Sequence, residues 1–153
     1  ILRCVGGYTV KEEMFLQCWE IVSRMELWFL SNCPFEEMSR GDYMMLNLLT
    51  QSANDGKMMT VTMISDSLKV SKAAISQSIK ALKKKEWVKS ISDITDKRKS
   101  YIVLTDEGRK AYEKQRKVII RNLQECFRDV DEADLKMFCD KLTKVAEQIS
   151  LKI

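Results

Sequence analysis

The sequence contains no histidine among its 153 residues. Histidine is the commonest general base in enzymes and the commonest metal ligand, so its absence weakens both kinds of interpretation. The chain also lacks a glycine-rich phosphate loop, a G-x-S-x-G motif and a paired-carboxylate motif. We therefore predict that the chain is not an enzyme, has no catalytic residues, and holds no metal and no cofactor.

Cysteine pairs, long apolar runs and prolines are also scarce. The five cysteines are scattered without C-x-x-C spacing, which supports neither a disulfide framework nor a cysteine zinc site. No apolar stretch approaches the ~20 residues of a membrane span, and no signal-peptide pattern is present. The single proline leaves no candidate interdomain hinge. The length of 153 residues also predicts one domain, over residues 1–153. Together these features predict a cytoplasmic protein with reduced thiols and no membrane contact.

The formal net charge of +4 is unevenly distributed along the chain. Residues 57–110 contain thirteen Lys and Arg against six Asp and Glu, an excess of seven positive charges. Residues 1–56 contain four against eight, so the amino-terminal third is acidic. Positive charge concentrated on one segment is what counterion-releasing DNA contact requires. The middle segment is therefore the predicted DNA-binding part.

The middle segment begins with two short helical patterns that meet at residues 68–70. Ser71 has the residue type of an N-cap, whose side-chain oxygen accepts from an otherwise unpaired helix N–H. In the second helix Ile75, Ile79 and Leu82 recur at helical spacing and predict one buried face. The opposite face carries small, polar and cationic side chains: Lys72, Ala73, Ser76, Gln77 and Lys80. Such a face suits a helix in the major groove, although an ordinary solvated helix explains the same pattern.

Two runs with strand character follow, at residues 87–91 and 101–104. The loop between them, residues 92–100, is polar and has a cationic tip. Helix, turn, helix and charged hairpin is the order of a winged helix-turn-helix. Cations on such a wing are expected to reach the DNA backbone or the minor groove, whose negative potential attracts arginine.

Two short motifs follow the helix pair at residues 60–88: Asp-Lys-Arg at residues 96–98 and Leu-Thr-Asp-Glu-Gly at residues 104–108. This combination resembles the wing-to-helix signature of the MarR family of bacterial transcriptional regulators, and the resemblance spans residues 11–149. Three positions depart from the family pattern. Lys69 and Glu86 stand where glycine is common, and Ser90 stands where arginine is frequent. Both missing glycines are turn positions that other residues occupy at modest cost.

The resemblance implies a ligand-responsive repressor that binds palindromic double-stranded DNA as a homodimer. In the family the arginine matching Arg98 enters the minor groove, and the aspartate matching Asp96 holds that arginine or the wing. Gln77 is the best base reader, because glutamine pairs bidentately with adenine. The full predicted DNA-binding set is Ser71, Lys72, Ala73, Ser76, Gln77, Lys80, Lys84, Asp96, Lys97, Arg98 and Lys99.

The last predicted helix carries an apolar stripe with near-heptad spacing: Leu135, Phe138, Leu142, Val145 and Ile149. Spacing alone leaves open whether this stripe packs on the chain's own first helix or on a partner. The resemblance implies a mainly α fold with a small β-hairpin wing, in which the winged helix-turn-helix spans about residues 40–104. Helices at about 10–31 and 106–150 then intertwine with a second copy, and two recognition helices read half-sites about one helical turn apart.

Two further features leave alternatives open. Many MarR-like proteins bind small aromatic or hydrophobic effectors between the dimer helices and the winged helix, where the candidates are Trp19, Trp28, Tyr43, Met44 and Met63. Plain core filling explains the same residues.

A MarR-like branch senses peroxide with a cysteine on the first helix, but the position of Cys18 on an apolar stripe favours a buried, inert thiol. The alternatives are a thiol-based redox regulator and a winged helix used for protein–protein contact.

Overall fold

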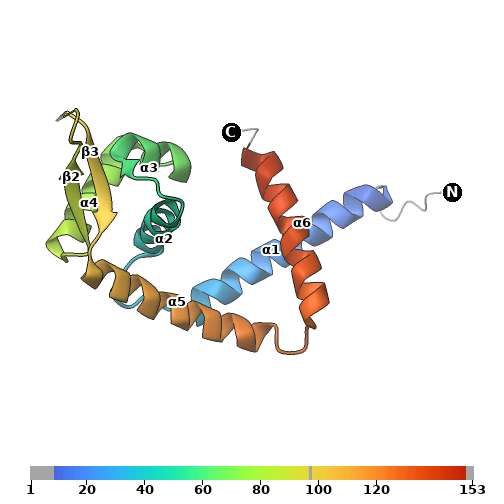
Figure 1. The fold of residues 1–153 in the computed structure, drawn as a ribbon. Helices are drawn as coiled ribbons and strands as arrows, with labels where there is room; N and C mark the ends of the chain where they lie inside the picture. Colours follow the sequence, from blue (N-terminus) through green and yellow to red (C-terminus); the bar gives the residue numbers. More distant parts are fainter. Residues whose placement is uncertain (1–8, 97, 151–153) are drawn as a thin grey trace. The chain divides into compact units, whose positions relative to one another are not determined.

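The computed structural model describes residues 9–96 and 98–150, with the side chains of residues 149 and 150 outside the description (Figure 1). Its elements are α1 (Val10–Asn32), α2 (Arg40–Asn54), β1 (Met59–Thr60), α3 (Val61–Leu68), α4 (Lys72–Lys84), β2 (Val88–Ser92), β3 (Ser100–Leu104), α5 (Asp106–Cys126) and α6 (Glu132–Ser150). The fold is mainly α with one small sheet, which is the predicted class. The chain divides into two compact units, residues 1–116 and 117–153, and the division falls within α5. In the described part of the chain, no helix is long and apolar enough to cross a membrane.

Side-chain caps set where the first two helices begin. Thr9 Oγ1 accepts from the Glu12 N–H at 3.3 Å, and the Glu12 carboxylate accepts from the Thr9 N–H at 2.7 Å. Ser39 and Asp42 form the same reciprocal pair before α2. Each pair satisfies two backbone donors that would otherwise lack a partner at a helix start. Because Ser39 is the cap, α2 begins at Arg40.

The sheet has three antiparallel strands in the order β1-β3-β2. Strands β2 and β3 form the predicted hairpin, paired from Val88 opposite Leu104 to Ser92 opposite Ser100. Strand β1 pairs Met59 with Ile102 on the other edge of β3. The sequence did not reveal β1, because two residues carry no measurable alternation and only the pairing with β3 defines them as a strand.

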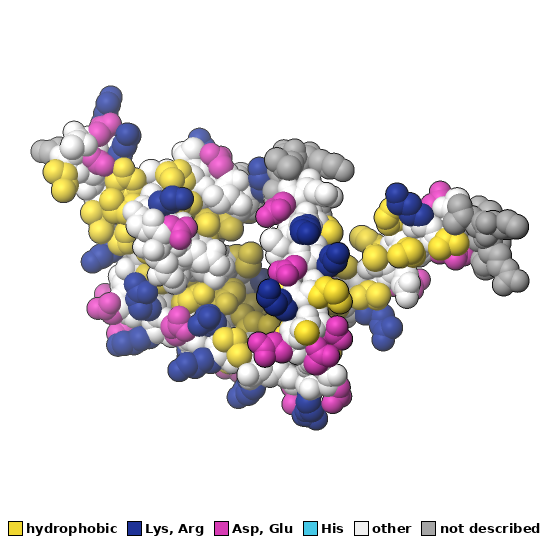
Figure 2. All heavy atoms as spheres, turned by 45° about the vertical axis from the view of Figure 1, so that its right-hand side comes forward, with side chains coloured by type: hydrophobic (Ala, Val, Ile, Leu, Met, Phe, Trp, Pro, Cys, Tyr) yellow, Lys and Arg dark blue, Asp and Glu magenta, His cyan; other side chains and the backbone are white. Residues whose placement is uncertain are grey.

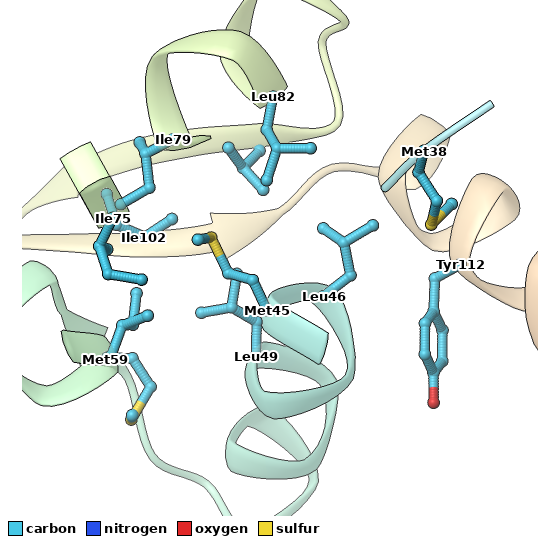
Figure 3. Packing of buried hydrophobic residues seen from close by; sticks show 12 residues of the cluster. Met38, Met45, Leu46, Leu49, Met59, Ile75, Ile79, Leu82, Ile102 and Tyr112 are labelled. Atoms are coloured by element: carbon cyan, nitrogen blue, oxygen red, sulfur yellow. The ribbon is translucent and has the colours of Figure 1, made fainter. Parts of the chain in front are cut away.

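A hydrophobic core of twelve buried residues joins helices α2, α3 and α4 to the sheet and to α5 (Figure 3). Met45, Leu46, Ile64 and Leu82 are the largest fully buried side chains. Fully burying a side chain of this size stabilises the fold by about 1.5–3 kcal/mol relative to leaving it exposed. The core therefore fixes the backbone of α4 against the sheet, and so fixes which face of α4 points to solvent.

Helices α1 and α6 each expose apolar side chains. The described part of α1 contains no buried residue, and Trp19 is 71% exposed. On α6, which belongs to the second unit, Leu142 is 46% exposed and Val145 is 52% exposed. Figure 2 shows hydrophobic side chains at the surface of the amino-terminal helix. Apolar surface of this extent on a single chain is typical of a protein interface.

Candidate nucleic-acid interface

Helix α4 has one buried face and one exposed face. Ile75, Ile79 and Leu82 are no more than 5% exposed and pack in the core. The side chains predicted to face DNA are all exposed: Lys72, Ala73, Ser76, Gln77 and Lys80. Helix α4 packs against α3 and against β2, and Figure 1 shows it beside the β2–β3 hairpin. The helix thus offers a polar, cationic surface on a fixed backbone, as a major-groove reader requires.

The turn between α3 and α4 is closed by local hydrogen bonds. Lys69 adopts the left-handed conformation (φ 55°, ψ 38°), which a non-glycine residue adopts only at some cost. The Ser65 hydroxyl donates to the Val70 carbonyl at 2.7 Å. Ser71 then caps α4 by accepting from the Ala74 N–H at 3.3 Å. This bond uses only an acceptor site of Ser71, so its hydroxyl hydrogen can still donate to a phosphate.

Lys83 and Lys84 at the end of α4 have different surroundings. The Lys83 ammonium donates to the Ser90 hydroxyl on β2 at 2.5 Å. Lys83 thereby brings a cation to the strand position where the family resemblance expects an arginine. Lys84 is exposed and has no ion-pair partner among the residues that the structure describes. Of the two, Lys84 therefore has the charge more readily available to a phosphate.

Lys85 forms a hydrogen bond with the loop between α1 and α2. Its ammonium donates to the Glu37 carbonyl at 2.6 Å and lies 4.5 Å from the centre of the Trp87 ring. The Glu37 carboxylate pairs with Lys114 on α5, and this hydrogen bond raises the pKa of Lys114. Glu37 and Lys85 are 48 residues apart, so the sequence pattern carried no signal for this link.

The wing loop is organised around the carboxylate of Asp93. One of its oxygens accepts from the Thr95 hydroxyl (2.6 Å), the Thr95 N–H (2.8 Å) and the Asp96 N–H (2.9 Å). The other accepts from the Tyr101 hydroxyl on β3 at 2.9 Å. These bonds, led by that of the Thr95 hydroxyl, hold the pKa of Asp93 far below its ordinary value. The loop is therefore fixed to the sheet through Asp93, a residue that the sequence analysis did not single out.

Asp96 holds Arg98 at the tip of the wing. The Arg98 Nε and its backbone N–H each lie 3.1 Å from the same oxygen of Asp96. The Arg98 side chain, as the main cause, lowers the pKa of Asp96. Even so, the side chain of Arg98 is 91% exposed, so the ion pair orients the guanidinium while leaving it accessible. Lys99 is exposed in the same loop, and Lys97 lies outside the described residues.

The expected effector residues have mixed surroundings. Tyr43 is half-buried and stacks on Tyr112 with ring centres 5.4 Å apart, and burial is the first cause that raises the pKa of Tyr43. Trp28 is half-buried and meets Phe29 edge-on at 5.3 Å. The remaining three are exposed by more than 40%: Trp19, Met44 and Met63. The structure thus gives Tyr43 a packing role in the winged helix.

A cavity of about 290 Å³ lies elsewhere, between the end of α2, strands β1 and β3, and the start of α5. Its lining includes apolar side chains such as Met58 and Leu104, together with the cations Lys57 and Arg109. None of the five expected effector residues lines this cavity. The winged helix therefore contains a small hollow that the sequence pattern did not indicate.

None of Cys18, Cys33, Cys126 and Cys139 forms a disulfide, and no group suited to a metal exists among the described residues. Cys33 is buried, whereas Cys18 is exposed on α1. This differs from the expectation of a buried thiol at Cys18, because the apolar stripe that contains it is itself uncovered in the single chain. A surface that covers this stripe would bury Cys18.

Comparison with known proteins gives a family match for part of the chain and a fold for most of it. Residues 37–99 match the model of the MarR family. The structure is similar to that of the transcriptional regulator SlyA, with 19% identity, a TM-score of 0.69, and coverage of 90% of this chain and 95% of SlyA. No curated protein sequence matches the chain.

Two further similar structures were solved with a bound molecule. FabT of Streptococcus pneumoniae, in complex with DNA, has 15% identity and a TM-score of 0.65 over 93% of this chain and 96% of FabT. The regulator PcaV of Streptomyces coelicolor, in complex with its natural ligand, has 19% identity and a TM-score of 0.63 over 86% of this chain and 89% of PcaV. The matched family and the named regulators act in transcription and are not enzymes.

Proposed function

We propose that this chain, whose residues 37–99 match the model of the MarR family, is a transcriptional regulator that binds specific double-stranded DNA sequences. The proposal rests on two exposed elements, α4 and the wing, which are held by the same hydrophobic core. Helix α4 exposes Lys72, Gln77 and Lys80, and the wing exposes Arg98. The excess of seven positive charges over residues 57–110 lies on this same winged helix. FabT, which shares the fold, was solved on DNA.

In the proposed complex α4 lies in the major groove and the wing lies along the minor groove. Gln77 reads a base edge, since its amide matches the N6 and N7 groups of adenine. Ala73, Ser76 and Lys80 contribute base-edge or phosphate contacts. Residues that mainly position the protein on the backbone are Ser71, Lys72, Lys84, Lys97 and Lys99. Arg98 enters the minor groove, with Asp96 orienting its guanidinium.

The proposed active form is a homodimer on a palindromic operator. The support is the uncovered apolar surface of α1 and α6, where Trp19, Leu142 and Val145 are each at least 46% exposed in the single chain. A second copy that covers these faces removes apolar area from water and brings two α4 helices to one operator. Two recognition helices then reach half-sites about one helical turn apart.

The proposed role is repression of transcription in the cytoplasm. A small aromatic or hydrophobic effector would relieve this repression. Binding of the effector shifts the spacing of the two α4 helices and thus weakens the affinity for DNA. The size of this effect depends on how much more tightly the effector binds the altered spacing than the DNA-binding spacing. Candidate effector residues are Trp19, Trp28, Tyr43, Met44 and Met63. PcaV, a similar structure, was solved with its natural ligand.

The salt dependence of duplex DNA binding tests the DNA-binding function. Fluorescence anisotropy with a mixed-sequence duplex should show an affinity that falls steeply and log-linearly between 50 and 200 mM salt, because each neutralised phosphate releases a condensed cation. A chain that binds no duplex DNA at 50 mM salt would contradict the proposal and favour a winged helix used for protein contact.

The exposed thiol of Cys18 supports a second candidate, a redox regulator of the same fold. In that case peroxide would abolish DNA binding, a thiol reductant would restore it, and Cys18→Ser would be insensitive to peroxide. Peroxide that leaves the affinity of the wild type unchanged would rule out this candidate.

A further inference from the structure

The wing displays one apolar side chain almost completely to solvent. Ile94 is 97% exposed, the highest value among the exposed large hydrophobic residues of the described chain. It is the sole apolar residue between Ser92 and Ser100. Burying an isoleucine side chain is favourable by about 1.5–3 kcal/mol, so a free chain gains nothing by holding one in water. A single exposed apolar side chain is common on protein surfaces, so what distinguishes Ile94 is its place in the loop that also carries exposed cations.

Hydrogen bonds on both sides of Ile94 order the loop that displays it. Asp93, the residue before it, accepts hydrogen bonds from both Thr95 and Asp96, which are the two residues after it. Asp93 is in turn bound to Tyr101 on the sheet. The Asp93 N–H also donates to the Lys99 carbonyl at 3.0 Å, closing the base of the loop. The backbone on both sides of Ile94 is thus fixed with the side chain pointing out.

The same loop carries the cations proposed to face DNA. Arg98 is 91% exposed at its side chain and Lys99 is exposed. Figure 2 shows hydrophobic, cationic and acidic side chains together at the end of the wing. A single apolar side chain among charged neighbours is far smaller than the core of a protein interface, which is also depleted in charged residues. The surroundings of Ile94 therefore favour a nucleic-acid surface over a protein surface.

An apolar side chain beside a cation is the combination with which proteins engage the DNA minor groove. The cation is attracted by the negative potential of the narrow groove, and an apolar wedge packs against sugars or enters between base steps. Isoleucine is one of the side chains used as such wedges. Pyrimidine–purine steps such as TA unstack most easily and so accept a wedge at the lowest cost.

We propose that Ile94 is a minor-groove wedge, which packs into the groove beside Arg98 and makes the wing select for an easily opened TA or CA step. The inference rests on the proposed DNA-binding function and adds to it a second source of sequence preference. In this scheme α4 reads base edges in the major groove, and the wing reads the deformability of the DNA at the outer end of each half-site.

The test compares Ile94→Ala with Ile91→Ala. Ile91 is the matched control, because it lies on β2 of the same hairpin, is 41% exposed and is paired to Tyr101 rather than displayed at the tip. Both variants are first checked for unchanged thermal unfolding. A duplex selected by the wild type from a random pool then serves as the probe for affinity, and fluorescence transfer between labels at its two ends reports bending.

The expected result is a loss of about tenfold in affinity for Ile94→Ala, with a smaller bend and no remaining preference for TA or CA steps under the wing. Ile94→Leu should retain most of the affinity, and Ile91→Ala should stay within about twofold of the wild type. An Ile94→Ala variant that matches the wild type in affinity, bend and step preference would overturn the wedge while leaving the DNA-binding function intact. A wild type that selects no duplex at all would instead contradict the DNA-binding function, and with it the wedge.

Discussion

Gly108 on α5 packs directly against the backbone carbonyl of Trp87, at the junction between α4 and β2. A Cβ atom built on Gly108 would lie 1.9 Å from the Trp87 oxygen and 2.7 Å from its carbonyl carbon. The neighbouring Thr105 reinforces the junction, since its N–H donates to the Trp87 carbonyl at 3.0 Å and its hydroxyl donates to the Glu86 carbonyl. This close approach fixes the start of α5 to the strand that carries the wing.

The first prediction is that Gly108→Ala destabilises the winged helix. The added methyl group meets backbone, which moves less readily than a side chain, and overpacking of this kind costs about 1–3 kcal/mol. Urea unfolding should show the loss as a lower midpoint. Gly41→Ala is the control, because its Cβ has only an ordinary contact at 3.7 Å and alanine favours a helix. Equal midpoints for Gly108→Ala and the wild type would contradict the close packing.

A second prediction concerns the effect of pH on the wing. The folded protein holds the pKa of Asp93 below its ordinary value of 3.8, so the charged form adds stability above that pH. The added stability should begin to decline as the pH falls below about 4, and it should continue to decline toward the lower pKa of the folded state. Asp93→Asn should therefore be less stable than the wild type at pH 7, and the difference should shrink at pH 3. The comparison of urea midpoints at both pH values is the measurement, and a difference that is the same at both would refute the role of the charge.

The third prediction concerns the wing cation. Arg98→Ala should weaken binding to specific and nonspecific duplexes alike, and lower the slope of log affinity against log salt by about one. Unfolding should be unchanged, because Arg98 is exposed and its ion pair with Asp96 is solvated. Arg116→Ala on α5 is the control, since Arg116 is also an arginine in an ion pair and its side chain is 50% exposed. Affinity and slope equal to those of the wild type would exclude Arg98 from the interface.

The fourth prediction concerns assembly. Leu142→Glu should convert a dimeric wild type into a monomer in sedimentation at micromolar concentration. Leu142 is 46% exposed in the single chain, so the charge costs little there but is expensive when a second copy covers it. Gln148→Glu adds the same charge to an exposed polar position of α6 and should remain dimeric. A wild type that sediments as a monomer would contradict the dimer and the effector-driven change in helix spacing.

The local parts of the fold were predictable from the sequence because short-range rules govern them. Ser71 marked the start of α4 through its capping oxygen, and the spacing of Ile75, Ile79 and Leu82 gave the buried face. The hairpin followed from two β-branched and aromatic runs around a polar loop. In each case the residues that determine the structure lie within a few positions of one another.

The features that escaped prediction depend on residues far apart in the sequence or on chemistry without a pattern. Strand β1 exists only through its pairing with β3, and the Lys85 ammonium finds the Glu37 carbonyl across 48 residues. Asp93 looked like one of several polar loop residues, and its role depends on the position of Tyr101. Cys18 seemed buried because its stripe is apolar, yet its burial depends on what covers the stripe, which sequence spacing cannot specify.

The most direct test of the account is the selection of binding sites by the wild-type protein from a pool of random duplexes. A dimer that reads DNA through α4 should enrich two inverted half-sites with centres about one helical turn apart. Enrichment of a single half-site, or a pool that stays random while the protein is folded, would contradict sequence-specific binding by a dimeric winged helix.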